Sequence, residues 1–195
     1  LGDLLNQTVV PENRPGAGGI TGTDTAVRAA PDGYTMLLGW DGLQINTGLY
    51  KNLSYSIASF APITMAITAP QVLVVNNSLP ARNVPEYIAL AKKNPGKMTV
   101  ASPGSGSPGH LAAALFMSMT GTQLIHVPYK GAGPAVTDLV AGQVAMTFTS
   151  TVSVMPFVKA GRLRGIAVTT PKRAPTLPLL REVLQRLDQQ RASRN

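Results

Sequence analysis

Short apolar runs alternate with helix-like stretches along most of this 195-residue chain. In the first eighty residues, the runs with the length and composition of β-strands are 8–10, 34–38, 63–67 and 72–75. A helix is expected at 20–30, where Pro31, Asp32 and Gly33 end it. Residues 40–60 have no regular pattern. The first part of the chain therefore predicts a strand, a glycine-rich turn, a helix and further strands.

The second half of the chain repeats this alternation more regularly. Strands are predicted at 98–101, 124–127, 144–148 and 165–168, and helices at 83–93, 110–119, 134–140 and 154–159. Asn83, with Glu86 three residues later, is typical of a helix start. Leu111, Leu115 and Met119 lie on one face of the following helix. Because strands that alternate with helices form βαβ units, we predict an α/β fold with mostly parallel sheets.

Two α/β blocks of this kind predict two lobes with a ligand cleft between them. We assign residues 1–78 to the first lobe and residues 79–170 to the second. Residues 171–195 are expected to form a return segment and a basic C-terminal helix, in which Leu180, Leu184 and Leu187 share one face.

Composition excludes several classes of protein. The chain has 44 % apolar and 13 % charged residues, which excludes a disordered polypeptide. The absence of cysteine excludes disulfides and thiolate chemistry. The chain has no run of 18 apolar residues, so no membrane-spanning helix is predicted. The first residues lack the charged and apolar regions of a signal peptide, so we expect any such peptide to precede residue 1 or to have been removed.

The net charge of +8 is the feature that would suggest a nucleic-acid partner. Its distribution argues against one, because residues 1–158 carry a net charge of +1 and residues 159–195 a net charge of +7. A surface that follows a phosphate backbone needs clustered cations beside stacking aromatic side chains. The body of the chain has neither, so no nucleic-acid partner is expected.

The loop 102–109, between a predicted strand and a predicted helix, is the strongest candidate site. Its glycines let a ligand approach the backbone, and Ser105 and Ser107 add hydroxyl donors before His110. The amino end of a helix favours anions, so we expect a carboxylate or a phosphate here. An ordinary loop of small residues is the alternative. A second glycine-rich stretch at 13–19 also precedes a helix; it could bind an anion or simply turn the chain, and we favour the turn.

The same loop has the spacing of a dinucleotide-binding fingerprint, at Gly104, Gly106 and Gly109. That fingerprint needs an acidic residue about 20 positions later, and none lies between Glu86 and Asp138. The sequence also lacks the known nucleophile and metal motifs. We therefore predict a binding protein that is not an enzyme and has no cofactor or metal. A nucleotide-binding α/β enzyme that uses the Gly104–Gly109 loop is the alternative.

Seven short stretches combine into one larger pattern: 12–19, 30–39, 60–63, 101–111, 126–131, 138–144 and 159–164. In their order and spacing they resemble the extracytoplasmic receptors of tripartite tricarboxylate transporters, also called Bug receptors, over about residues 8–178. The resemblance implies a Venus-flytrap fold of the periplasmic-binding-protein type II class. It also implies a small carboxylate ligand in the cleft, a periplasmic location, and the permease subunits of a membrane transporter as partners.

The resemblance further implies which residues contact the ligand. They are Gly39, Trp40, Asp41, Ser105, Gly106, Ser107, His110 and Thr149. Residues 39–41 would face the cleft from the first lobe, and the serine–glycine loop would hold the ligand from the second. Family members often carry acidic residues where Ala145 and Thr149 stand here, so ligands with an amino group are not expected.

Two departures from the family pattern imply an incomplete first lobe. Family members begin with a further strand and ligand loop, and they continue after the position of Pro178 with a segment that completes that lobe. Unpaired sheet edges recruit other chains, so we expect a homo-oligomer, most simply a dimer. A receptor that has lost its ligand and serves as an oligomeric module is a further alternative.

Overall fold

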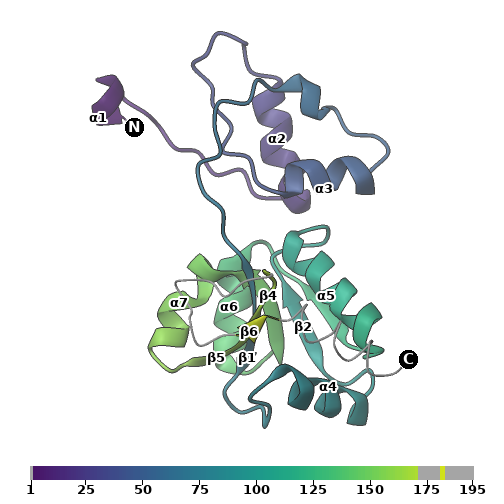
Figure 1. The fold of residues 1–195 in the computed structure, drawn as a ribbon. Helices are drawn as coiled ribbons and strands as arrows, with labels where there is room; N and C mark the ends of the chain where they lie inside the picture. The colour runs from purple at the N-terminus through teal and green to yellow at the C-terminus, as the bar shows by residue number, and fades with distance from the viewer. Residues whose placement is uncertain (1, 171–180, 183–195) are drawn as a thin grey trace.

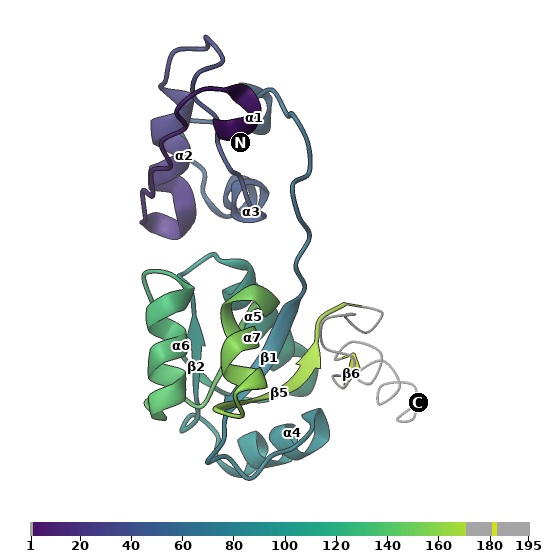
Figure 2. The same cartoon turned by 90° about the vertical axis from the view of Figure 1, so that its left-hand side faces the viewer.

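The computed structural model describes residues 2–170 and 181–182 of the chain (Figure 1). Residues 71–170 build a sheet with helices on both faces, and residues 2–70 lie beyond one end of that sheet (Figures 1 and 2). The basic helix predicted within 171–195 lies outside the described residues except at Arg181–Glu182, which form a short strand and not a helix.

The described strands form one mixed sheet with the order β3-β2-β4-β1-β5-β6. They are β1 (Gln71–Asn76), β2 (Thr99–Ser102), β3 (Ile125–Pro128), β4 (Met146–Ser150), β5 (Leu163–Val168) and β6 (Arg181–Glu182). β2 runs parallel to β3 and β4, and β5 to β6, but β1 is antiparallel to both of its neighbours. The prediction of a mostly parallel sheet is therefore wrong at its centre. β1 enters from an extended connector and not across a helix, so no crossover fixes its direction.

Four helices connect these strands and cover the sheet: α4 (Val84–Lys93), α5 (Pro108–Thr120), α6 (Ala132–Ala141) and α7 (Thr151–Lys159). On one face, Leu73 belongs to a buried cluster with Tyr87 of α4 and Phe116 of α5. On the other face, Val74 belongs to a cluster with Leu139 of α6. Successive strand residues point to opposite faces, and both faces of the sheet are covered, so the middle of β1, from Val72 to Val75, is apolar at every position. The predicted α/β alternation of the second half is confirmed.

Local capping explains where two of these helices begin. The Asn83 side chain accepts the Glu86 backbone N–H at 3.0 Å, and the Glu86 carboxylate accepts the Arg82 N–H at 2.7 Å, as the sequence predicted for the start of α4. Ser107 caps α5 by accepting the His110 N–H at 3.3 Å. Gly121 ends α5 in the left-handed conformation, at φ 64°.

The N-terminal part contains helices but no strand within residues 2–70. Its elements are α1 (Gly2–Leu5), η1 (Ala17–Gly19), α2 (Ile20–Val27), α3 (Gly42–Leu49) and η2 (Ile57–Ser59). The strands predicted at 8–10, 34–38 and 63–67 are therefore wrong, as is the sheet expected for a first lobe. Tyr34, Leu38 and Ile63 are at least 80 % exposed on extended backbone that pairs with no strand among the described residues, and a strand exists only through such pairing.

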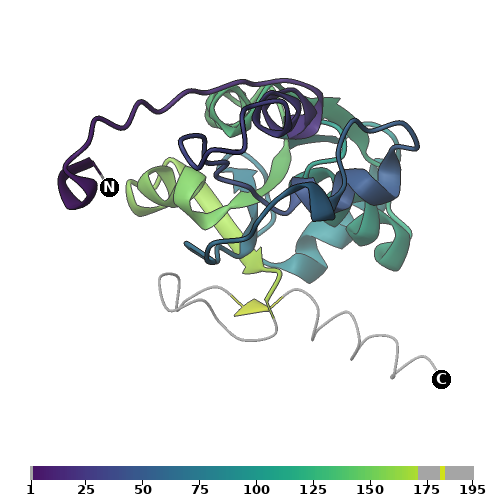
Figure 3. The same cartoon turned by 90° about the horizontal axis from the view of Figure 1, so that it is seen from above.

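The ends of this N-terminal part differ in how they pack. Figures 1 and 3 show α1 apart from the other helices, joined to them by an extended stretch. Figure 2 shows a second extended stretch that runs from η2 down to β1. In that connector Ile63, Met65 and Ile67 are all more than three-quarters exposed. The N-terminal part and the sheet are thus joined by chain that itself packs on neither.

Gly109 provides a test of how closely α5 packs on β4. It is the second residue of α5, and a Cβ there would collide with the backbone carbonyl of Phe148. We expect Gly109→Ala to destabilise the protein by about 2 kcal/mol or more, although alanine is normally the better helix former by about 1 kcal/mol. Urea or thermal unfolding measures this change.

Gly133 is the matched control, because it is the second residue of α6 and has open space around its Cβ position. Gly133→Ala should leave the free energy of unfolding unchanged or raise it by up to about 1 kcal/mol. Equal free energies of unfolding for the two variants would contradict the packing of α5 on β4.

Candidate functional site

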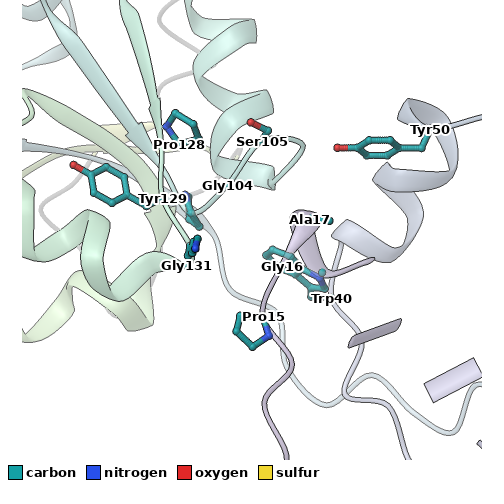
Figure 4. Close-up of a pocket in the computed structure, with 14 residues that line it drawn as sticks. Pro15, Gly16, Ala17, Trp40, Tyr50, Gly104, Ser105, Pro128, Tyr129 and Gly131 are labelled. Carbon is teal, nitrogen blue, oxygen red and sulfur yellow. The ribbon is translucent and has the colours of Figure 1, made fainter. Parts of the chain in front are cut away.

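A pocket of about 420 Å³ lies between the N-terminal part and the sheet (Figure 4). Three loops line it, 15–19, 103–105 and 128–131, together with the aromatic side chains of Trp40 and Tyr50. The last two loops follow the parallel strands β2 and β3. The pocket therefore lies at the carboxyl ends of these strands, the edge where α/β proteins commonly bind ligands.

Hydrogen bonds join the two loops that come from the sheet. The Tyr129 N–H donates to the Ser102 carbonyl at 3.0 Å, and the Gly131 N–H donates to the Pro103 carbonyl at 2.9 Å. The Tyr129 hydroxyl donates to the Asp138 carboxylate on α6 at 2.6 Å. Partial burial, this hydrogen bond and the charge of Asp138 together raise the pKa of Tyr129 to about 12. The phenol thus stays protonated and holds its loop to α6 across the physiological pH range.

Trp40 forms the wall of the pocket that comes from the N-terminal part. Its indole lies against two glycines: a Cβ on Gly19 would be 2.7 Å from the indole Nε1, and one on Gly42 would be 2.8 Å from Cε2. No other residue could stand at either position without moving the ring. Trp40 is still 45 % exposed, so one side of the indole remains available to a ligand.

The two parts of the chain touch directly beside the pocket. A Cβ on Gly18 would lie 2.9 Å from the Ser105 carbonyl, which shows how closely the two backbones approach. The buried Asn46 side chain donates to the Gly18 carbonyl at 3.1 Å. Its Oδ1 would lie 3.6 Å from a Cβ on Gly106 and accepts no hydrogen bond within the described residues. Asn46 of α3 therefore supports the 16–19 loop against the loop that precedes α5.

Two stacked histidines lie behind the 102–106 loop. The rings of His110 and His126 are 4.1 Å apart between centroids, at an interplanar angle of 16°. His126 Nε2 lies 2.7 Å from the Ser102 hydroxyl. Burial, and then the positive charge of His110, lower the pKa of His126 below its ordinary value. His126 is therefore neutral at pH 7. In this form it shares a hydrogen bond with the Ser102 hydroxyl at the end of β2.

Across residues 2–170 and 181–182, no group of three or more His, Asp or Glu side chains could hold a metal ion. Within the same residues, none of the helices combines the length and apolar character needed to cross a membrane.

Comparison with known proteins connects this geometry to a family. Residues 1–189 match the profile of the tripartite tricarboxylate transporter family receptor, TctC. The chain belongs to this family. The family consists of receptors that are not enzymes, so the prediction of a non-enzymatic protein is confirmed and the nucleotide-dependent enzyme is excluded.

Three relatives illustrate the match. A UPF0065 protein of Pseudomonas sp. strain P51, named for the tcbD-tcbE intergenic region, is 40 % identical over 179 residues, which are 91 % of this chain and 53 % of that protein. The structure of R. palustris Rpa4515 with adipate has a TM-score of 0.90 at 33 % identity over 94 % of this chain. The periplasmic binding protein BugD has a TM-score of 0.90 at 36 % identity over 95 % of this chain. The chain spans 62 % of each of these two structures.

Of the eight site residues predicted for this TctC-family chain, Trp40 and Ser105 line the pocket. Gly39 and Asp41 flank Trp40 just before α3. Thr149 is 2 % exposed in β4, where it pairs with Val72. These last three residues lie outside the pocket lining, so a ligand role for them stays a prediction.

Gly106, Ser107 and His110 lie at the start of α5 and bond to one another. The Gly106 N–H donates to His110 Nδ1 at 3.1 Å, and the Ser107 hydroxyl accepts the His110 N–H. None of the three lines the pocket, and the amides of Gly106 and His110 already have partners within the protein. Of this loop, Pro103, Gly104 and Ser105 are the residues that line the pocket.

Sequence reasoning missed Tyr50 and two of the three lining loops as sites. For the 13–19 stretch the sequence favours a simple turn over an anion site, but Gly16, Gly18 and Gly19 all have positive φ and line the pocket. Residues 128–131 contributed to the sequence analysis only as part of a motif of the receptor family. The available signal was position, because this loop follows a strand parallel to β2 and must leave the sheet at the same edge.

Trp40 is the only tryptophan in the chain and reports directly on the pocket wall. Gly42→Ala would place a methyl group within 3 Å of the indole, so we expect the ring to move and its fluorescence emission to shift. Gly48→Ala in the same helix meets no atom within 4 Å and should leave the emission unchanged. Identical spectra for both variants would contradict the seating of Trp40 on Gly42.

The histidine pair predicts a pH dependence of stability. The folded pKa of His126 lies below the unfolded value of about 6.5, so the unfolded chain binds more protons between the two values. The contribution of neutral His126 to the free energy of unfolding is therefore fully present above pH 6.5. It is lost as the pH falls through the folded pKa. We expect Tm to drop between pH 7.5 and 5.5, and His126→Gln to make that drop smaller. An unchanged pH slope in the variant would contradict the shift.

Proposed function

We propose that this protein is an extracytoplasmic receptor that binds a small carboxylate and delivers it to the membrane subunits of a tripartite tricarboxylate-type transporter. Membership of the TctC family and the periplasmic relative BugD support a periplasmic location and transporter partners. The relative Rpa4515, which resembles this chain at a TM-score of 0.90, was solved with adipate. That ligand supports a carboxylate as the class of molecule recognised.

The composition of the pocket is the observation that carries this proposal. Among the described residues that line it, none is acidic and one, Lys130, is cationic. Ser105, Trp40 and Tyr50 supply hydroxyl and indole donors around an apolar middle. A pocket of about 420 Å³ with apolar walls and a few polar groups suits a small organic anion.

We further propose that ligand binding draws the N-terminal part, residues 2–70, and the sheet, residues 71–170, together as the two lobes of a receptor. The pocket is lined from both parts, so a bound ligand would contact both at once. The extended connector between η2 and β1 packs on neither part, which suits it to act as a hinge. Closure would exclude water and strengthen the polar contacts to the anion.

A second function has its own supporting observation. Exposed apolar side chains alternate along two extended stretches, Tyr34, Met36 and Leu38 in one and Ile63, Met65 and Ile67 in the other. Large exposed apolar surfaces commonly mark contacts between proteins. A homodimer that covers these stretches would make the chain an oligomeric module, whether or not it binds a ligand.

Ligand titration tests the receptor function. Adipate should raise Tm and change Trp40 fluorescence, because a ligand that binds only the folded state at 100 times its Kd adds about 2.7 kcal/mol. The uncharged dimethyl ester should do neither. Ser105→Ala should weaken adipate binding about tenfold, since a hydrogen bond to a charged group contributes about 1.5–3 kcal/mol.

Ser118→Ala is the matched control, because Ser118 is an exposed residue of α5 outside the pocket. It should bind adipate as the wild type does. A folded protein that responds to no di- or monocarboxylate would contradict the receptor function. Light scattering on the same sample then tests the oligomeric module, which requires a particle of at least twice the chain mass.

A further inference from the structure

Among the described residues that line the pocket, Lys130 is the only one that carries a full charge at neutral pH. The ion pairs found within the described residues join Arg14 to Glu12 and Arg28 to Asp24, so they leave Lys130 without an acidic partner. The side chain is exposed, in the loop between β3 and α6. The ammonium group is thus free to bind an anion that enters the pocket.

The backbone on both sides of Lys130 is held in place. Hydrogen bonds from the Tyr129 and Gly131 amides fix its neighbours to the segment after β2, and the Tyr129 hydroxyl is bound to Asp138. The Cα of Lys130 therefore has little freedom, and only its side chain must be ordered when a ligand binds. Fixed backbone lowers the entropic cost of an ion pair with a flexible lysine.

The remaining free donors lie on other parts of the wall. The Trp40 indole N–H and the Tyr50 and Ser105 hydroxyls make no hydrogen bond within residues 2–170. Figure 4 shows Trp40 and Tyr50 on the opposite side of the pocket from Tyr129 and Gly131, the residues on either side of Lys130 in the chain. Trp40 and Tyr50 thus offer neutral donors on one side of the pocket, whereas Ser105 and Lys130 belong to the loops on the sheet side.

We propose that Lys130 determines the charge specificity of this pocket by pairing with the second carboxylate of a dianionic ligand. The neutral donors then hold the first carboxylate, and the apolar middle accommodates the carbon chain. This inference rests on the proposed receptor function and adds the residue that distinguishes a dicarboxylate from a monocarboxylate of the same length.

Length-matched pairs of acids test the role of Lys130. Adipate and hexanoate share a six-carbon chain, and succinate and butyrate a four-carbon chain, and each pair differs by one carboxylate. Trp40 fluorescence or calorimetry measures each affinity for the wild type and for Lys130→Met, which keeps a similar length and removes the charge. We expect the wild type to prefer the diacid of at least one pair about tenfold or more, and Lys130→Met to lose that preference.

The loss should fall on the diacid alone, with monoacid affinity changed less than about twofold. Lys130→Arg should retain the preference. Lys97→Met, which removes another exposed lysine outside the pocket, should behave as the wild type. Salt should weaken diacid binding in the wild type more than in Lys130→Met, because exposed ion pairs are screened.

The outcomes separate this inference from the function on which it rests. If the wild type binds none of the four acids, both fail. If it binds them but Lys130→Met keeps the diacid preference, or weakens mono- and diacids equally, the receptor function stands and the assignment of Lys130 to a second carboxylate is wrong.

Discussion

β2 and β3 run parallel and end together, and the position of the pocket depends on that pairing. Ser102 and Pro128 are partners at the last register position, so the chain leaves both strands at the same edge of the sheet. The amides of Tyr129 and Gly131 then bind the segment that leaves β2. A slip of one residue between these strands would turn each side chain to the opposite face and break both loop contacts. The pocket is therefore a consequence of strand register as much as of the residues that line it.

The wall of the pocket that comes from the N-terminal part depends on glycine residues. Gly18 approaches the Ser105 carbonyl, and Gly19 and Gly42 leave room for the indole of Trp40. Contacts made by the backbone do not change when a side chain changes rotamer. They therefore fix the shape of the wall more firmly than side-chain packing would. The side chains that remain free in the pocket can then differ in chemistry without changing its shape.

The sequence predicted the second half of the chain well because its elements are defined by local and repeated signals. Asn83 and Glu86 mark a helix start, and the apolar run of β1 needs burial on both faces. The prediction for the N-terminal part failed for a physical reason: the residues at 34–38 have strand composition, but no strand in the described part of the chain pairs with them. The candidate loop was found, although the sequence alone could not tell that Ser107 is used to cap α5.

The net charge of the chain likewise does not predict the charge of the pocket. The net charge of +8 comes almost entirely from residues 159–195, whereas the pocket contains a single cation. A lysine with no acidic neighbour among the described lining residues gives a local field whose sign is clear. Under the proposed receptor function, an anion is therefore selected by the few groups that the strand register brings together, and the net charge of the whole chain is a poor guide to what the pocket recognises.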